Sequence, residues 1–259
     1  MGGFLFAAMT ACSGDNGPIS AGTNTGGGAA AGDGGNTGGT AGGSSTFRID
    51  KSGYIVSGQW KGYAFVYAGT KTAGAPASTV ATVPPCTGTG ADGGPEVNFS
   101  CIEAGATQLC IQGSIAGVSD YSGVAMIGVN VNQGNIADDA GNNPQGTIAI
   151  GGTGITVTYT NPAKSVMRLQ IQGVGGDTPG TGGATARWCA TLSGNGGTET
   201  VTWAQFYGGV SDTTQGCWNS GGNNPAVGTE ITQVSLLVPG DDVDAVPFDF
   251  CLQSIGQVG

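Results

Sequence analysis

Between residues 47 and 259 apolar and polar side chains alternate in short runs, and this periodicity constrains the fold more than any other feature. A period of two places successive side chains on opposite faces of a β-strand. Gly, Asn, Asp or Pro ends the runs about every ten residues, as turns between strands require. The pattern predicts strands over residues 54–57, 62–67, 109–115, 123–132, 146–150, 155–159, 165–172, 186–192, 231–238 and 248–254.

No segment of this region has a convincing helical period. Short strands without helical crossovers pair in antiparallel fashion, and the apolar faces of two such sheets bury each other. We therefore predict an all-β fold for residues 47–259, an antiparallel β-sandwich of the jelly-roll type.

Several predicted strands have one apolar and one polar face. In residues 123–133, Ala125, Ile127 and Val129 share the apolar face, and Asn130 and Asn132 lie on the other. Amides both donate and accept hydrogen bonds, which suits them to sugar hydroxyls. The alternative is that these amides keep a solvated sheet face polar in a chain with few charges.

The strands at 109–115 and 165–172 follow the same pattern. Gln112 is on the polar face of the first, and Arg168, Gln170 and Gln172 are on the polar face of the second. The same two interpretations, a ligand-binding face or a solvated face, apply here.

An aromatic segment covers residues 60–67. Tyr63, Phe65 and Tyr67 alternate on one face of the predicted strand, and Trp60 precedes them. Aromatic rings can stack on the apolar faces of sugar rings, but they also fill sandwich cores. The sequence leaves both placements open.

The charge composition excludes several classes of function. The formal net charge is −10, from 17 acidic and 7 basic residues, and the basic residues are scattered. Nucleic-acid binding depends on clustered Lys and Arg, so we expect no nucleic-acid partner. The chain has no histidine, which excludes Ser-His-Asp triads and His-ligated zinc.

The 7 cysteines divide into one near the N-terminus and six in the body of the chain. Six cysteines in an exported, turn-rich chain suggest three disulfides, and none forms a CxxC pair typical of zinc or redox sites. Among the 15 possible pairings we predict Cys86–Cys101, Cys110–Cys251 and Cys189–Cys217.

The N-terminal residues 1–12 have the character of an export signal. A short apolar run ends in Met9-Thr10-Ala11-Cys12, which resembles the lipobox of bacterial lipoproteins, in which the cysteine is lipidated. The glycine-rich residues 13–46 offer little to bury, so we expect a disordered tether. The alternative for residues 1–12 is a buried segment with an incidental cysteine.

Several segments carry a resemblance to a group of secreted or lipid-anchored proteins of myxobacteria and related bacteria. They are Ala-Arg-Trp-Cys-Ala-Thr-Leu at 186–192, Val-Thr-Trp-Ala-Gln-Phe at 201–206, Cys-Trp-Asn at 217–219, and residues 123–133, 231–240 and 247–251. Those proteins are similar to galactose-binding jelly rolls, carbohydrate-binding modules and the complex I intermediate-associated domain. The resemblance covers residues 47–259 and implies the fold more strongly than the ligand.

The resemblance implies a ligand site on one sheet face or in the loops at its edge. The residues that it nominates are Gln112, Asn130, Asn132, Arg168, Gln170, Trp203, Tyr207 and Trp218. It also implies a structural calcium, with Asp50 and Asp249 as candidate ligands. The acidic segments at 138–143 and 241–244 are further calcium candidates or ordinary solvated turns.

Together these features predict an exported, lipid-anchored protein of the bacterial outer membrane that binds a polysaccharide without catalysis. A structural or adhesive surface protein is the alternative. A hydrolase or lyase is less favoured, because glycosidases need paired carboxylates and we expect Glu96, Glu103, Glu199 and Glu230 to lie in or beside loops.

Overall fold

A computed structural model describes residues 47–58, 60–70, 75–89, 95–97, 99, 101–103, 105–135, 146–175, 186–208, 217 and 222–259. The proposed signal and lipobox at 1–12, with Cys12, and the tether at 13–46 lie outside the described residues. The acidic segment at 138–143 lies outside them as well.

The larger sheet has nine strands, and all of its pairings are antiparallel. It contains β1 (Arg48–Ile49), β2 (Tyr54–Ser57), β3 (Trp60–Gly69), β8 (Val124–Asn130), β9 (Ile148–Ala149), β11 (Arg168–Gly173), β12 (Arg187–Thr191), β14 (Tyr207–Gly208) and β15 (Glu230–Pro239). Its centre runs in the order β3-β8-β15-β11-β12, so strands far apart in sequence are neighbours.

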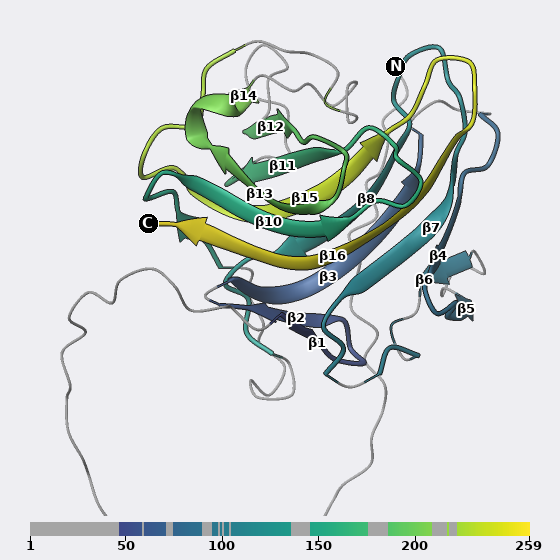
Figure 1. Ribbon diagram of the computed structural model, residues 1–259, viewed down its shortest axis with the longest axis horizontal. Coiled ribbons are helices and arrows are strands. Elements are labelled where there is room, and N and C mark those ends of the chain that lie inside the picture. The colour runs from purple at the N-terminus through teal and green to yellow at the C-terminus, as the bar shows by residue number, and fades with distance from the viewer. Residues whose placement is uncertain are drawn as a thin grey trace, which may run out of the picture. The chain divides into compact units, whose positions relative to one another are not determined.

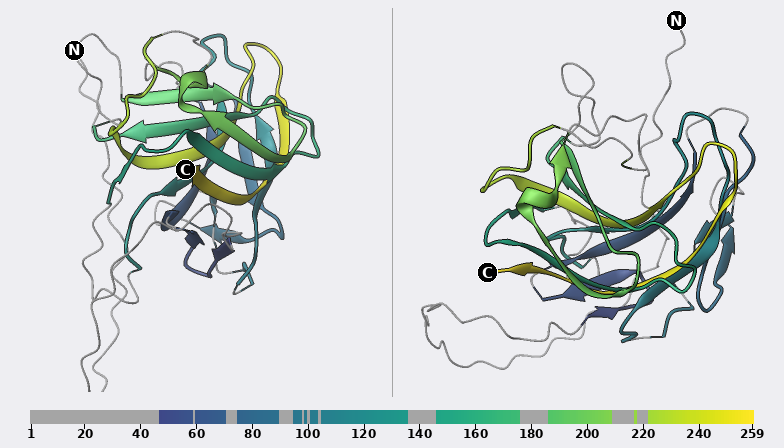
Figure 2. Two further views of the ribbon diagram at one scale, coloured as in Figure 1. Left: turned by 60° about the vertical axis from the view of Figure 1, so that its left-hand side comes forward. Right: turned by 45° about the horizontal axis from the view of Figure 1, so that its top comes forward.

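The second sheet has five strands in the order β13-β10-β16-β7-β4, also antiparallel. Its members are β4 (Thr79–Thr82), β7 (Leu109–Ile115), β10 (Gly154–Thr160), β13 (Gly197–Thr202) and β16 (Val246–Val258). A separate two-stranded ribbon pairs β5 (Thr87–Thr89) with β6 (Pro95–Val97). The long strands of both sheets bend along their length (Figures 1 and 2).

The chain changes sheet repeatedly between β7 and β16, in keeping with the predicted jelly roll. Within the described residues the one helical element is a short 3-10 turn, η1 (Trp203–Gln205). The predicted antiparallel β-sandwich is therefore confirmed, and the strand at Leu109–Ile115 has the predicted bounds.

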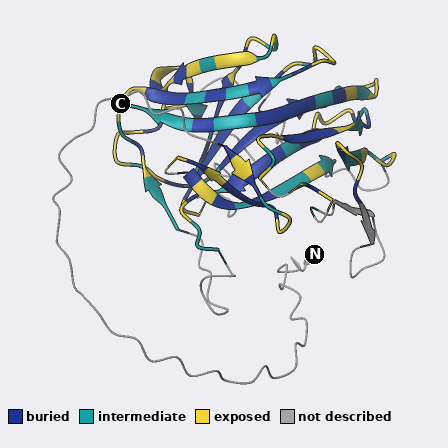
Figure 3. Cartoon of the chain, turned by 60° about the horizontal axis from the view of Figure 1, so that its bottom comes forward, coloured by how far each residue is buried: buried dark blue, intermediate teal, exposed yellow. Residues whose placement is uncertain are grey.

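The core contains the apolar set of alternating side chains from both sheets. Ile111, Ile155 and Phe250 of the smaller sheet meet Ile127 and Leu236 of the larger one, and all are fully buried. Figure 3 shows buried segments alternating with intermediate and exposed ones along the strands. Each such side chain stabilises the fold by about 1.5–3 kcal/mol, so the alternation itself selects the sandwich.

Trp60 belongs to this core, with 1% of its surface exposed, whereas Tyr63, Phe65 and Tyr67 lie on the opposite face of β3 and are partly exposed. Trp60 therefore packs in the core, as one interpretation of the aromatic segment expected, and the other three rings lie on the side away from it.

All three predicted disulfides are present: Cys86–Cys101, Cys110–Cys251 and Cys189–Cys217. Cys110–Cys251 joins β7 to β16 at a directly opposed pair. Cys189–Cys217 ties residue 217 to β12.

One buried hydroxyl joins the two sheets through hydrogen bonds. Ser57, at the end of β2, donates to the carbonyl oxygen of Ile255 on β16 at 2.6 Å, and its oxygen accepts from the Ile255 N–H at 3.0 Å. Removing the hydroxyl leaves both backbone groups of Ile255 without these bonds in a dry environment.

We expect Ser57→Ala to lower the free energy of unfolding by about 1–3 kcal/mol, because two buried backbone groups lose their partner. Urea denaturation measures this loss. Ser114→Ala, at a partly exposed position on β7, is the control and should change stability by about 0.5 kcal/mol or less. Equal effects of the two substitutions would contradict the role assigned to Ser57.

Candidate functional site

The face of the nine-stranded sheet that points away from the core carries four of the eight ligand residues nominated from sequence: Asn130, Arg168, Gln170 and Tyr207. Residues that are paired across neighbouring antiparallel strands share a face. The register therefore defines three rows that cross β3, β8, β15, β11 and β12 on the side away from the core. The first row is Tyr67-Met126-Leu237-Arg168-Thr191. The second row is Phe65-Gly128-Ser235-Gln170-Cys189. The third row begins on β8 and is Asn130-Gln233-Gln172-Arg187.

We call these three rows, together with Tyr63 on β3 and Tyr207 on β14, the outer face. Tyr63 belongs to it by alternation with Phe65, and Tyr207 because it pairs with Cys189.

The aromatic side chains of β3 form one side of the outer face. Tyr67 is 37% exposed, and Tyr63 and Phe65 are partly exposed. Phe65 lies over Gly128 of β8, where a Cβ atom would overlap its ring. The missing side chain at Gly128 thus gives the ring room to lie across the neighbouring strand. Partial burial raises the pKa of the Tyr67 hydroxyl.

Hydrogen bonds hold the amides next to this aromatic row. The Asn130 amide donates to Gln133 Oε1 at 3.2 Å, and the backbone N–H of Tyr63 donates to the same oxygen at 3.3 Å. The Tyr63 hydroxyl donates to Asn135 Oδ1 at 3.2 Å, and its ring packs edge-on against Tyr54 with centroids 5.1 Å apart. Asn130 is therefore placed beside the aromatic side chains.

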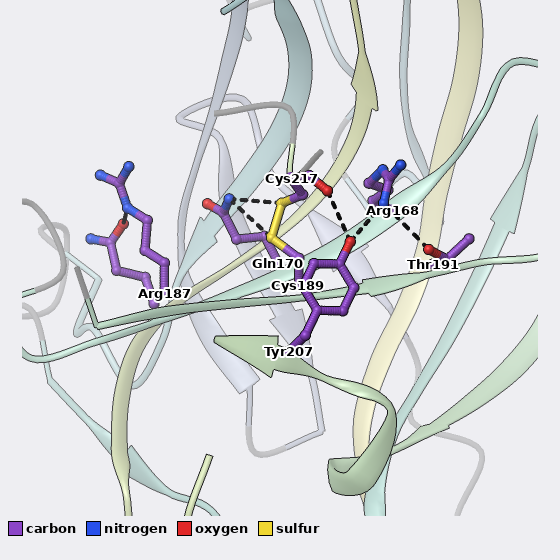
Figure 4. Close-up of a disulfide and its surroundings, with 8 residues drawn as sticks. Arg168, Gln170, Arg187, Cys189, Thr191, Tyr207 and Cys217 are labelled. Atoms are coloured by element: carbon purple, nitrogen blue, oxygen red, sulfur yellow. Dashed lines mark hydrogen bonds between the residues drawn. A yellow bond between two sulfur atoms is a disulfide. The ribbon is translucent and has the colours of Figure 1, made fainter. Parts of the chain in front are cut away.

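Arg168 and Tyr207 form a second polar group on the outer face (Figure 4). Arg168 Nη1 donates to the Tyr207 hydroxyl at 2.6 Å and to Thr191 Oγ1 at 3.3 Å. The Tyr207 hydroxyl donates in turn to the carbonyl oxygen of Cys217 at 2.9 Å. Two residues nominated separately from sequence are thus in direct contact.

Gln170 does not lie on an open polar face, which corrects the sequence prediction. It is 6% exposed, and its amide nitrogen lies 3.2 Å from Cys217 Sγ and 3.6 Å from Cys189 Sγ, beneath the disulfide (Figure 4). Gln172, also 6% exposed, accepts a bond from Arg187 Nε at 3.1 Å. The Cys189–Cys217 disulfide places residue 217 against β11. Strand periodicity alone could not predict this contact.

Two other nominated residues lie outside the three rows. Asn132 is exposed just after β8 and donates to the Thr147 carbonyl oxygen at 3.1 Å. Trp203 is 8% exposed, belongs to the core and donates to the Gly151 carbonyl oxygen at 2.9 Å, which corrects its assignment as an available loop aromatic. Trp218 lies outside the described residues.

Gln112 and Asp249 lie on the opposite side of the sandwich. They are register partners on β7 and β16 and line a shallow depression with Thr79, Val80, Ala81, Gly113 and Phe248. Gln112 therefore lies on a different face from the nominated ligand-binding residues of the outer face, beside the candidate calcium ligand Asp249.

The two candidate calcium ligands are on different sheets. Asp50, after β1, accepts bonds from the Ser52 N–H at 2.8 Å, the Ser52 hydroxyl at 2.5 Å and the Tyr54 N–H at 3.0 Å. Burial would raise the pKa of Asp50, but these bonds outweigh it and the pKa lies below its usual range. Among the described residues no group of three or more His, Cys, Asp or Glu could hold a metal ion. The calcium site stays a prediction.

The face of the smaller sheet over β13, β10 and β16 is covered with hydroxyl groups. Thr158 Oγ1 lies 3.0 Å from Thr198 Oγ1 and accepts from Ser254 Oγ at 2.8 Å, and Thr156 and Thr200 approach to 3.1 Å. These hydroxyls bond to one another across the strands, and none of them is ionisable. This face differs in character from the outer face.

The sequence analysis expected Glu96 and Glu199 in or beside loops; Glu199 lies within β13, and Glu96 lies in the three-residue strand β6. The Tyr159 hydroxyl, the Ser193 hydroxyl at 2.7 Å and the Ser193 N–H at 2.9 Å all donate to the Glu199 carboxylate. Burial would raise the pKa of Glu199, but these bonds outweigh it and lower the pKa. Burial and the same carboxylate raise the pKa of Tyr159.

Folding lowers the pKa of Glu199, so the ionised carboxylate stabilises the folded state. This stabilisation is complete at pH values above the ordinary pKa of glutamate, and it is lost as the pH falls through the lowered pKa of the folded state. We expect Glu199→Gln to cost about 1 kcal/mol at about pH 7 and much less at about pH 3. Urea denaturation at both pH values measures this, with the exposed Glu103→Gln as control. A cost that persists unchanged in acid would contradict the ionised network.

Comparison with known proteins gives no assignment: neither the family models nor the curated proteins match this chain. Within the part of the chain that is described, no helix has the length and apolar character needed to cross a membrane.

Proposed function

We propose that the protein is a non-catalytic carbohydrate-binding lipoprotein that presents the outer face to a polysaccharide. The observation that carries this proposal is the partly exposed row Tyr63, Phe65 and Tyr67 beside the oriented amide of Asn130. Aromatic rings supply apolar contact at low conformational cost, and the neighbouring amide supplies hydrogen bonds of both kinds.

The geometry favours an extended ligand over a single sugar. Alternate residues along a strand are about 6.6–6.8 Å apart, so the three rings extend over about 13 Å. A row of this length can contact successive rings of one chain. Rigid strands hold it, which reduces the ordering cost of binding.

A structural or adhesive role is the second candidate. It is favoured by the burial of Gln170, Gln172 and Arg187, because these side chains stabilise the covering of the sheet. Under this alternative the aromatic row would contact another surface protein and no sugar.

Tyr67→Ala should weaken binding of the best oligosaccharide by about tenfold, because a stacking contact and a hydroxyl donor are lost. A glycan array identifies the ligand, and calorimetry measures the affinity. Tyr121→Ala is the matched control, since Tyr121 is 40% exposed but belongs to the connection between β7 and β8 and not to the row. Binding unaffected by Tyr67→Ala, or weakened equally by both changes, would contradict the proposed site.

We also propose that Cys12 carries the lipid that anchors the protein to the bacterial outer membrane. Cells expressing the wild type should incorporate labelled palmitate into the protein, and Cys12→Ala should abolish the incorporation. Ser13→Ala, the neighbouring control, should retain it. Label that persists in Cys12→Ala would refute the anchor.

A further inference from the structure

Two glycines determine how the rings of the aromatic row lie on the sheet. At Gly128 of β8, a Cβ atom would stand 2.0 Å from Cζ of Phe65 and 2.3 and 2.6 Å from its two Cε atoms. These three distances are similar, as they are when a ring covers a position with its face; a ring that pointed its tip there would bring Cζ alone so close. The Phe65 ring therefore lies flat across β8, with its other face turned away from the sheet.

Tyr67 lies over a second glycine. At Gly69, two residues further along the same face of β3, a Cβ atom would stand 2.6 Å from the Tyr67 hydroxyl oxygen, 2.9 Å from Cζ and 3.4 Å from Cε2. The ring is thus laid along its own strand, and 37% of the residue is exposed. Each of the two rings occupies the space that a missing side chain leaves free.

Glycine weakens the interior of a strand relative to alanine, and it occurs there where another group must approach the backbone closely. Here the approaching groups are the two rings. Tyr63, the first ring of the row, is held differently, because it packs edge-on against Tyr54 and its hydroxyl bonds to Asn135. The open part of the outer face is therefore a pair of flat rings with an upright ring at one end.

We infer that this pair of flat rings selects a ribbon-like polysaccharide, a β-1,4-linked chain of pyranose rings whose hydroxyls are equatorial. This inference rests on the proposed function and names its ligand class. Equatorial hydroxyls leave both faces of a sugar ring apolar, so a face can lie directly on an aromatic ring. An axial hydroxyl would stand between the two surfaces and hold them apart.

The shape of the chain discriminates between linkages. Phe65 and Tyr67 are about 6.6–6.8 Å apart along β3 and lean toward different glycines, so a ligand must be extended to cover both. A β-1,4-linked chain keeps the flat faces of successive sugars in one plane. An α-1,4-linked chain coils, so its second sugar turns away from the second ring. Gly128 and Gly69 are thus specificity-determining positions, because they set the tilt of the rings.

The test compares two hexasaccharides of glucose that differ only in linkage. Cellohexaose is β-1,4-linked and maltohexaose is α-1,4-linked, so composition, charge and length are the same. The full-length protein should bind cellohexaose at least about tenfold more tightly, a difference that one stacking contact supplies. Calorimetry measures both affinities.

Gly128→Ala assigns this preference to the flat rings. The added methyl group displaces the tip of the Phe65 ring, so affinity for cellohexaose should fall about tenfold while affinity for maltohexaose stays unchanged. Gly256→Ala is the matched control, because Gly256 lies in β16 of the other sheet and an added Cβ there would meet no described atom within 4 Å. Thermal melting of each variant checks that it is folded.

A double variant tests whether Gly128 acts through the ring. Phe65→Ala alone should weaken cellohexaose binding about tenfold. Adding Gly128→Ala to Phe65→Ala should cause no further loss, because the ring that the methyl group displaces is already gone. A further loss in the double variant would mean that Gly128 acts through the strand, and it would overturn the role assigned to the tilt of the ring.

The outcomes separate this inference from the proposed function. Equal affinity for the two hexasaccharides, or tighter binding of maltohexaose, would overturn the inference while leaving carbohydrate binding intact. Binding of other glycans but of neither hexasaccharide would do the same. Binding of neither, together with no binding on a glycan array, would overturn the proposed function as well. The comparison on wild-type protein needs no substitution, so a misfolded variant does not affect it.

Discussion

Burial of every second side chain between the two sheets is the constraint on which the rest of this structure depends. Once Ile127 and Leu236 are committed to the core, Met126 and Leu237 must point away from it, and the cross-strand register arranges these outward residues into rows. A one-residue shift of any central strand would exchange its two faces. The same pairing that excludes water from the core therefore builds the outer face.

The outer face is itself divided into a covered part and a more open part. Around Cys189–Cys217, a small apolar cluster includes Val124 and Leu237, and Gln170 lies beneath the sulfur atoms. The aromatic row on β3 lies on the other side of the sheet's centre and stays partly exposed. The Cys189–Cys217 disulfide thus fixes the covered part of the outer face, and the strand β3 holds the more open part with the aromatic row.

The sequence predicted the fold well because alternation over apolar residues is a local signal. Residues 109–115 show it at Leu109, Ile111 and Ile115, and β7 has these bounds. β13 was missed because Gly-Thr-Glu-Thr-Val-Thr contains one apolar residue, so no alternation is visible. Its strand character comes from pairing with β10, which is a tertiary contact.

The site was predicted less completely, for a physical reason. Periodicity correctly placed Asn130 and Arg168 away from the core, but whether an outward side chain meets water depends on what folds over it. Gln170 is buried by Cys217, which is 47 residues away along the chain. Likewise the two arginines were read as isolated charges, because only the β11–β12 register shows that they share a face.

The central claim is that the outer face of the nine-stranded sheet, and not the hydroxyl-covered face of the five-stranded sheet, contacts the glycan. NMR spectra of the full-length protein, titrated with the oligosaccharide that binds best on a glycan array, test it most directly. The account predicts shifts in the ring resonances of Tyr63, Phe65 and Tyr67, with the methyl resonances of Thr156, Thr158 and Thr200 unchanged. Shifts confined to the three threonines, or shifts in neither group, would contradict it.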